Sequence, residues 1–334
     1  MSTKTHQSHK MQLSNQISQK LLFVVGKGGV GRTTVATSLA TYFAGKGESV
    51  LVVQWALKDS ISPLYSSPQC SHKEAALPSG FKVMNYSAAE AIKEYFVDHL
   101  KMKLLYSVII ENKHVQKLIH AAPGVQELFF LGRLFWLVEL AQSEKGYSYD
   151  RVIVDAPATG HAVSLFGIAP AIANFGITGP LANECDRVAK LIADPQKTGV
   201  IVVTLPEELP IEECYETIPK ITKQLNRSPN AIFLNQSINP HFFKGIENIK
   251  NEDWFIKMEE SFKYENSKEE LELILASLIK RDIFEKKLSI WAQNQENNHS
   301  PIPIVSLPDI GMMYKSTTSL TIINSLAKYY ESLA

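Results

Sequence analysis

A glycine-rich segment between residues 26 and 34 has the residue types and the spacing needed to bind a phosphate group. It reads Gly26-Lys27-Gly28-Gly29-Val30-Gly31-Arg32-Thr33-Thr34. Glycines let successive backbone N–H groups curl around an anion, and the N-terminus of a following helix adds partial positive charge. Thr33 is expected to place its hydroxyl on Mg²⁺, and Thr34 to reach an α-phosphate. The alternative is a glycine-rich turn that merely joins a strand to a helix.

Arg32 departs from the usual phosphate-loop pattern G-x-x-x-x-G-K-[ST], which has a lysine at this position. Arginine keeps the positive charge and can bind phosphates through two N–H groups. Its guanidinium is a planar fork, however, and does not tuck between β- and γ-phosphates as a compact ammonium does. The sequence therefore supports phosphate binding more firmly than it supports turnover.

A carboxylate follows a second apolar segment, at 152–154. Asp155 ends this expected strand and is followed by Ala-Pro-Ala-Thr-Gly and His161. A strand that ends in aspartate can place its carboxylate beside the phosphate loop, where it would hold Mg²⁺ through water. The turn at 157–160 could then respond to a γ-phosphate. The alternative is an ordinary helix-capping aspartate, with His161 as a hydrogen-bonded turn residue.

Short apolar strands and helical segments alternate along the chain and must position these groups. The expected strands lie at 21–25, 50–53, 151–154, 200–203 and 231–234, with a weaker one at 304–305. The expected helices lie at 33–46, 181–193, 211–226, roughly 252–295 with breaks, and 316–333. This alternation predicts an α/β fold, a doubly wound and mostly parallel sheet with helices on both faces.

The domain organisation predicted from the sequence is a polar flexible tail at 1–20 followed by a single domain at 21–334. A length of 334 residues also allows two domains, but no linker divides the chain. Residues 54–87 are expected to be loop-rich, and 88–145 to form a helical insertion.

Composition restricts the class of protein further. The chain has 34 basic and 34 acidic residues, and this zero net charge argues against nucleic acid as a partner. Three widely separated cysteines do not form a disulfide framework, so a reducing, cytoplasmic location is expected. The most apolar run, at 128–141, is too short to span a bilayer, which needs about 20 apolar residues. No secretory signal is expected at the N-terminus.

The two motifs together resemble one family of nucleotide-binding proteins. Lys27, directly after the first glycine, makes the deviant Walker A pattern K-G-G-x-G-[K]-T, and the Asp155 segment has the form D-x-P-x-T-G-H. These motifs resemble the ArsA-like and tail-anchored-protein-targeting branch of the deviant Walker A P-loop ATPases. Segments at 122–127, 204–212, 233–236 and 307–311 are also similar to that branch, so the resemblance covers about residues 20–330.

The resemblance implies ATP and Mg²⁺ as cofactors, with ATP and ADP as ligands of the phosphate loop. It also implies a dimer, because the extra lysine of these families, here Lys27, reaches across to the partner's nucleotide. The partner would be a second copy or a paralogous ATPase. By the same resemblance Asn235 would read the adenine edge, and Pro308 would belong to the last loop beside the base. Taken alone, Asn235 is equally well a turn-capping residue.

One catalytic feature of that branch is missing. Its water-orienting aspartate follows the second strand, and the position that matches it is Ala56. Gln54 or Asp59 could substitute, but both are more readily interpreted as loop residues. We therefore expect an ATPase with slow hydrolysis, acting as a nucleotide-dependent dimeric switch coupled to a client or membrane partner. The alternative is a non-hydrolysing regulatory or scaffold subunit paired with an active paralog.

The insertion at 88–145 contains two apolar runs, at 96–110 and at 128–137. In the targeting branch this region forms an apolar groove for a client's membrane helix, which needs exposed apolar surface. Apolar stripes more often face a core or a dimer partner, and that interpretation is favoured here. The last ten residues contain one basic residue, Lys328, so a membrane-anchoring helix is not expected.

Overall fold

The computed structural model describes residues 13–99, 124–157, 159–174, 180–238, 256, 265–294, 301–313 and 318–333. The strands are β1 (Leu21–Gly26), β2 (Val50–Gln54), β3 (Ala75–Ala76), β4 (Lys82–Asn85), β5 (Arg151–Asp155), β6 (Thr198–Thr204), β7 (Ala231–Ser237) and β8 (Ile304–Pro308). The longer helices are α2 (Arg32–Gly45), α3 (Ala88–Glu94), α6 (Val125–Phe135), α8 (Thr159–Asn174), α9 (Pro180–Ala193), α10 (Glu208–Leu225), α12 (Glu265–Gln293) and α14 (Ser319–Leu333). The shorter ones are α1 (Leu13–Gln16), η1 (Ser62–Tyr65), η2 (Tyr95–His99), η4 (Trp136–Leu140), α7 (Ala141–Lys145) and α13 (Ile310–Met313).

The strands form one eight-stranded sheet in the order β3-β4-β2-β5-β1-β6-β7-β8. Every neighbouring pair is parallel except β3 and β4. The inner strands are almost entirely apolar because helices cover both faces of a parallel sheet. β1 lies between β5 and β6, where the strand order reverses, and ligands of such sheets bind at the carboxyl ends of the strands at this point. The expected α/β class is confirmed.

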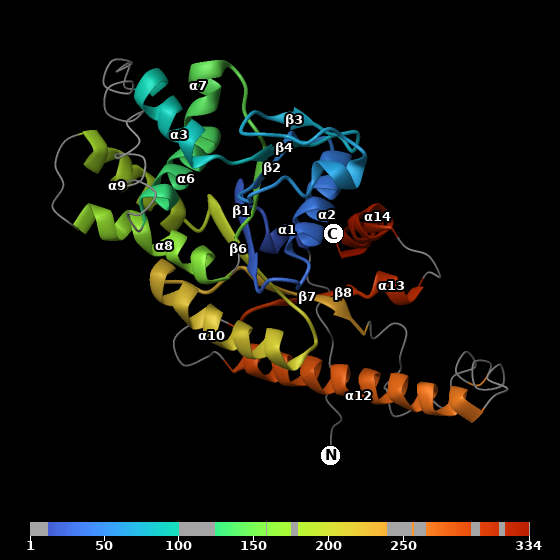
Figure 1. Cartoon of the computed structure of the whole chain (residues 1–334). Helices are drawn as coiled ribbons and strands as arrows, with labels where there is room; N and C mark the ends of the chain where they lie inside the picture. Colours follow the sequence, from blue (N-terminus) through green and yellow to red (C-terminus); the bar gives the residue numbers. More distant parts are fainter. Residues whose placement is uncertain are drawn as a thin grey trace.

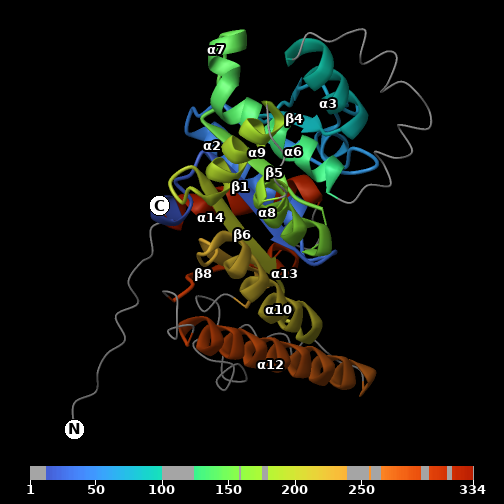
Figure 2. The ribbon, with the colours of Figure 1, turned by 90° about the vertical axis from the view of Figure 1, so that its left-hand side faces the viewer.

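Helices form a layer on each face of the sheet (Figures 1 and 2). One core joins α2 and α14 to the sheet, where Tyr330 packs on Tyr42 with ring centroids 5.8 Å apart and its hydroxyl lies 3.1 Å from Ser38 Oγ. The other core joins α6, α8, α9 and α10 to the opposite face, where Phe166 meets Phe23 edge to face at 5.2 Å. The long helix α12 runs beside α10 in both views.

The chain before β1 differs from the expected tail. Leu13 and Ile17 are fully buried in the core that contains α2, and α1 begins at Leu13. Gln19 also donates a hydrogen bond to the carbonyl of Pro195 at 3.0 Å. The expectation of a flexible tail at 1–20 was therefore wrong for residues 13–20, because two apolar side chains in a polar sequence are enough to dock the segment. Residues 1–12 lie outside the described residues.

The structure contains elements that the sequence analysis did not predict, among them β4 and α8. The stretch at 54–87, expected to be loop-rich, contains β4, which pairs in parallel with β2 and buries only Val83 and Met84. Helix α8 begins at Thr159, within the segment expected to be a turn, and it contains Gly160, Gly167 and Pro170. Glycine and proline lower helix propensity, so tertiary packing of Leu165 and Phe166 rather than local preference sustains this helix.

The stretch at 88–145, expected to form a helical insertion, is largely helical where it is described. Residues 88–99 and 125–145 form α3, η2, α6, η4 and α7. In the second apolar run, Phe130, Leu131 and Leu134 are fully buried against the sheet, which confirms the core interpretation for these residues. Most of the first run lies outside the described residues. Among the described helices, none has the length and apolar character required to cross a bilayer.

Candidate functional site

The segment at 26–34 forms an open loop between the carboxyl end of β1 and the first turn of α2. Gly29 and Gly31 adopt φ angles of 89° and 92°, a left-handed conformation that side chains with a Cβ atom rarely tolerate. Gly28 and Gly29 face open space, since a Cβ atom added at either would meet no atom within 4 Å. Val30, by contrast, buries its side chain in the core. The loop thus exposes backbone around a space that a phosphate can fill.

A hydroxyl and a carboxylate meet beside this loop. Thr33 Oγ1, in the first turn of α2, donates a 2.7 Å hydrogen bond to Asp155 Oδ2 at the end of β5. Asp155 is only 6% exposed. Burial raises the pKa of its carboxyl, while the hydrogen bond from Thr33 and the charge of Arg32 act in the opposite direction. The structure therefore brings together two side-chain oxygens from residues that lie 122 positions apart in the sequence.

The Thr33 and Asp155 oxygens suit a magnesium ion, which needs few protein ligands, better than a metal ion that is coordinated entirely by protein side chains. Mg²⁺ is usually held by one or two protein oxygens, with waters and phosphates completing its coordination. Among the described residues, no group of three or more His, Cys, Asp or Glu side chains could hold a metal ion. Thr34 follows Thr33 in the same turn and is partly exposed, as a phosphate contact requires.

Arg32 does not extend into the open part of the loop. Its Nη1 donates a 2.5 Å hydrogen bond to the carbonyl of Ala156, the residue directly after Asp155. Burial lowers the pKa of Arg32, and the charge of Asp155 opposes that shift. The guanidinium thus joins the start of α2 to the turn after β5, and it neutralises part of the buried carboxylate's charge.

Lys27 forms an ion pair within its own chain. Its Nζ lies 3.1 Å from Glu213 Oε2 on α10, and the two side chains are 39% and 30% exposed. Exposed pairs of this kind contribute little to stability, roughly 0–1 kcal/mol. Lys27 is therefore held loosely at the surface of the loop.

Asn235 has a contact that sequence reasoning missed. Its Nδ2 donates a 3.0 Å hydrogen bond to the carbonyl of Val30, and a Cβ atom on Gly31 would lie 2.3 Å from that nitrogen. Asn235 therefore supports the phosphate loop from the end of β7. No local signal identifies this contact, because it joins two distant segments. Pro308 ends the adjacent strand β8, and Asp309 after it pairs with Arg281 of α12 at 2.9 Å.

The segment after β2 offers no obvious replacement for a water-orienting aspartate. Gln54 is buried, and its amide pairs with the hydroxyl and the backbone N–H of Ser60 at 2.5 and 3.0 Å. Asp59 is also buried and accepts three backbone N–H groups, those of Ile61, Ser62 and Cys70, at 2.8–3.2 Å. Asp59 is therefore committed to shaping the loop, whereas Gln54 also hydrogen-bonds Asp155 and so joins the loop to the end of β5.

The pKa of Asp59 reflects this commitment. Burial acts to raise it, but the hydrogen bonds from the Ser62 hydroxyl and from the three backbone N–H groups outweigh burial and lower it below 3.8.

Trp55, in the same segment, packs against Tyr86 at 5.3 Å and against Phe130 of α6 at 4.9 Å between ring centroids.

The cysteines do not add a metal or metalloid site among the described residues. Cys70, Cys185 and Cys214 are all free, and the last two are buried. Burial raises the pKa of the Cys214 thiol to about 12, so it remains a neutral, unreactive thiol near neutral pH.

Comparison with known proteins agrees with this geometry. The family model described as anion-transporting ATPase matches residues 19–177, a span that contains both the phosphate loop and Asp155. The chain is 32% identical over 161 residues to the ATPase ASNA1 homolog 1 of Paramecium tetraurelia, which covers 47% of this chain and 45% of that protein. It is 27% identical over 259 residues to the ATPase GET3 of Mycosarcoma maydis, covering 68% and 75%. The chain therefore resembles the ArsA-like ATPases, and the match to the family model extends over residues 19–177.

A bacterial relative of this ArsA-like chain is the ATPase BagA of Mycobacterium tuberculosis, with 28% identity over 229 residues. That match spans 66% of each protein, so this chain covers about two thirds of the relative's length. The family match contains Lys27, Arg32 and Ala56 but ends before Asn235 and Pro308. The roles expected of Asn235 and Pro308 beside the base therefore lie outside the family match.

Proposed function

We propose that this chain binds ATP with Mg²⁺ at the 26–34 loop and acts as a nucleotide-dependent dimeric switch that hydrolyses ATP slowly. The observation that carries the proposal is the 2.7 Å hydrogen bond between Thr33 and Asp155 beside a loop of exposed glycine backbone. In magnesium–nucleotide sites a hydroxyl and a carboxylate occupy these positions, and the loop cradles the phosphates.

Each group has a separate role in this proposal. The N–H groups of Gly28, Gly29 and Gly31 bind phosphate oxygens, and the Thr33 hydroxyl holds Mg²⁺. Asp155 holds the ion through water, so its buried charge is compensated when the cation is bound. When bound, Mg²⁺ neutralises the charge that develops between the β- and γ-phosphates. Asn235 keeps the loop in shape through Val30.

Slow hydrolysis follows from what surrounds the attacking water. Ala56 has no side chain that can orient water, Asp59 is engaged within its own loop, and the Gln54 amide is shared between Ser60 and Asp155. Arg32 is engaged with the carbonyl of Ala156, so it must leave that acceptor before it can bind a γ-phosphate. The same observations favour a second candidate, a subunit that binds ATP without hydrolysing it and pairs with an active paralog.

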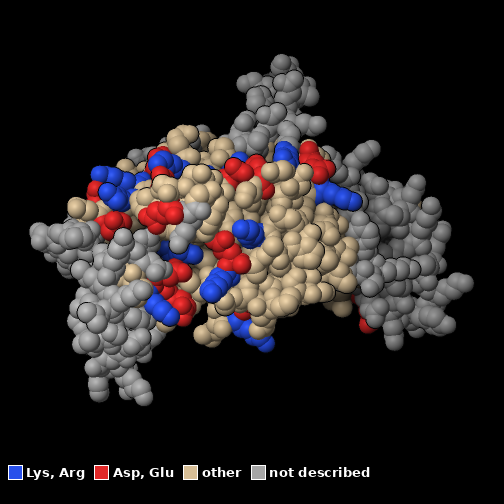
Figure 3. Space-filling view, turned by 90° about the horizontal axis from the view of Figure 1, so that it is seen from above, with Lys and Arg blue, Asp and Glu red and all other residues tan. Residues whose placement is uncertain are grey.

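Dimerisation rests on Lys27. In the resembling families this lysine contacts the partner's nucleotide, and the ion pair with Glu213 is weak enough to exchange for that contact. Figure 3 shows basic and acidic side chains interspersed on one face of the described part of the molecule. A coupled client would bind at the helical insertion, as the family resemblance implies.

The test is ATP turnover by the purified chain, alone and with Arg32→Lys, Ala56→Asp and both changes together. The matched control is Leu57→Asp, which places a carboxylate on the neighbouring, fully exposed position. We expect the double variant to raise kcat at least ~10-fold, because positioned acid–base groups contribute about 10²–10⁴-fold, and the control to change it less than ~2-fold.

The outcomes separate the two candidates. Rapid turnover by the unmodified chain without a partner would refute slow hydrolysis. An inactive double variant that still binds fluorescent ATP would favour the non-hydrolysing subunit. Sedimentation with and without a non-hydrolysable ATP analogue tests the dimer, which Lys27→Ala should abolish without changing ATP affinity.

A further inference from the structure

The positions of Thr33 and Asp155 set the direction in which a nucleotide lies along the sheet. β5, which ends at Asp155, neighbours β1 on one side, and β6, β7 and β8 follow on the other. Mg²⁺ bridges the β- and γ-phosphates of a nucleotide, so an ion held by Thr33 and Asp155 places these phosphates toward β5. The base then extends the other way, toward the carboxyl ends of β7 and β8.

The carboxyl ends of β7 and β8 are irregular. The register between the two strands shifts between Leu234 and Ser237. Gln236 lies inside that shift and has a φ angle of 54°, in the left-handed region that residues with a Cβ atom rarely adopt. Such a conformation persists only where the surrounding contacts hold it. The segment at 236–238 therefore depends on its neighbours for its shape.

Arg281 of α12 joins the ends of the two strands. Its Nη2 donates a hydrogen bond to the carbonyl of Gln236 and another, 2.9 Å long, to Asp309 Oδ2. The side chains of Arg281 and Asp309 are each only 17% exposed. Hydrogen bonds between charged groups are stronger than those between neutral ones, so the guanidinium is a firm link between the end of β7 and the residue after β8.

Glu285 adds a second link from the same helix. Its carboxylate accepts a hydrogen bond from the Ser237 hydroxyl at 2.9 Å and another from the backbone N–H of Ile238 at 2.6 Å. Residues four positions apart lie on one face of a helix, so Glu285 and Arg281 hold the segment at 236–238 from the same side.

α12 is itself fixed to the body of the protein beside these links. Phe284 and Leu288, which lie three and seven positions after Arg281, are buried in the core that includes α10. Trp291 packs on Tyr215 of α10 with ring centroids 4.6 Å apart. Figure 1 shows the helix running beneath β7 and β8. A support that is packed in this way can keep the segments it contacts in one geometry.

We propose that Arg281 and Glu285 are positioning residues for the base of the bound nucleotide. They hold the segment at 236–238 and Asp309 in the geometry in which these groups contact the base, whereas the phosphates are bound by the 26–34 loop itself. α12 thereby determines how much affinity the base adds to that of the phosphates. The inference rests on the proposed function, because it requires a nucleotide at the 26–34 loop.

The test is calorimetric titration of the full chain, with Mg²⁺ present, against ATP and against inorganic tripolyphosphate, which lacks the base and the ribose. Arg281→Met should raise the Kd of ATP roughly 3- to 30-fold, the range in which contacts remote from a ligand alter its affinity, and leave the Kd of tripolyphosphate within ~2-fold. Arg281→Lys keeps the positive charge but not the planar fork, so its ATP affinity should lie between those of the unmodified chain and Arg281→Met. Glu285→Gln should shift the ATP Kd in the same direction as Arg281→Met.

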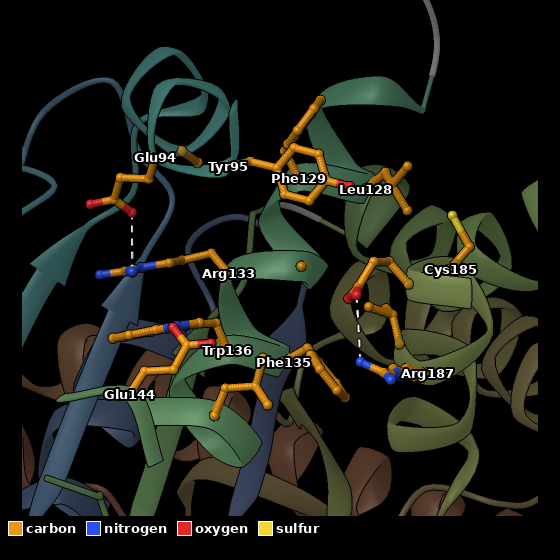
Figure 4. A pocket seen from close by; sticks show the side chains of 15 residues that line it. Glu94, Tyr95, Leu128, Phe129, Arg133, Phe135, Trp136, Glu144, Cys185 and Arg187 are labelled. Carbon is orange, nitrogen blue, oxygen red and sulfur yellow. Dashed lines mark hydrogen bonds and ion pairs between the residues drawn. The ribbon is translucent and has the colours of Figure 1, made fainter. Parts of the chain in front are cut away.

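A matched control removes an ion pair of the same kind elsewhere in the molecule. Arg133 of α6 lies 3.0 Å from Glu94, and its side chain is 13% exposed. The pair lines a cavity between α3, α6 and α9, apart from β7 and β8 (Figure 4). Because effects of distant sites are independent, Arg133→Met should leave the Kd of both ligands within ~2-fold.

The outcomes distinguish this inference from the proposed function. A chain that binds neither ATP nor tripolyphosphate refutes the proposed function and the inference with it. A chain that binds both, with an ATP Kd unchanged by Arg281→Met and by Glu285→Gln, overturns the inference alone. An equal loss of affinity for the two ligands in a variant that circular dichroism shows to be folded also overturns it, because the side chains then support the whole site. If Arg281→Met does not fold, Glu285→Gln decides between these results.

Discussion

The close approach of Gly31 to Asn235 predicts that the substitution Gly31→Ala lowers the stability of the fold. Gly31 has a φ angle of 92°, and an added Cβ atom would lie 2.3 Å from Asn235 Nδ2. Real Cβ atoms do not approach a nitrogen so closely, so the alanine must displace the Asn235 amide. That movement breaks the 3.0 Å hydrogen bond from Asn235 to the Val30 carbonyl.

Two effects determine how far Gly31→Ala lowers the free energy of unfolding. Holding an alanine in a left-handed conformation costs about 1–2 kcal/mol. Leaving a buried amide and carbonyl without their hydrogen bond costs about 1–3 kcal/mol. Alanine also gives the unfolded chain less conformational entropy than glycine does. This effect stabilises the folded state by about 0.4–1 kcal/mol, but only where alanine can adopt the native φ without strain. We therefore expect Gly31→Ala to lower the free energy of unfolding by about 2–4 kcal/mol.

The assay is urea unfolding followed by circular dichroism, with fluorescent ATP binding as a second measurement. Gly28→Ala is the matched control, since its Cβ atom would face open space, and it should change stability by less than ~0.5 kcal/mol. Asn235→Ala removes the obstructing amide. In the double variant the clash no longer occurs, so the combined loss should fall short of the sum of the single losses by about 1–2 kcal/mol.

Two results would refute this reasoning. One is a Gly31→Ala chain that unfolds within ~0.5 kcal/mol of the unmodified chain, which would mean that the loop adapts without cost. The other is strict additivity of the two single substitutions, which would mean that Gly31 and Asn235 do not touch.

Three further predictions follow from the described contacts. Asp59→Ala should cost about 2–3 kcal/mol at pH 7 because it leaves backbone donors unpaired. Since the pKa of Asp59 is lowered, its stabilisation is present above pH 3.8 and is lost as pH falls below that value, so chemical unfolding should show the two chains converging in acid. Ile17→Ala should cost about 2–4 kcal/mol in the same assay, and no loss would mean that the segment before β1 is not packed. Glu213→Gln should change stability by less than ~1 kcal/mol but increase ATP-dependent dimerisation through Lys27, and unchanged sedimentation would contradict that role.

The sequence was most informative where a motif is local and where neighbouring strands end together. The loop at 26–34 and the aspartate that ends β5 were expected to meet because the carboxyl ends of parallel strands share one edge of the sheet. The register of β1 against β5, which pairs Val24 with Asp155, produces this meeting, and Thr33 then lies 2.7 Å from the carboxylate.

The sequence was least informative where packing overrides local preference. Helix α8 contains two glycines and a proline, so no propensity argument identifies it, and β4 is too short for a clear alternation of apolar residues. The hydrogen bonds of Arg32 to Ala156 and of Asn235 to Val30 depend on side-chain directions after folding. Sequence patterns identify which residues can reach a phosphate, but not which of them are already engaged elsewhere.

The stacking of Trp55 on Phe130 links two parts of the chain that sequence reasoning treated separately. Trp55 follows β2 directly, next to Ala56, and its ring lies 4.9 Å from that of Phe130 on α6. Phe130 is fully buried, so α6 has no free space in which to yield at this contact. A shift of the segment that follows β2 would therefore be transmitted to the helical insertion through this one pair of rings. Because tryptophan emission responds to the packing of its ring, the same contact also supplies an intrinsic optical probe of that movement.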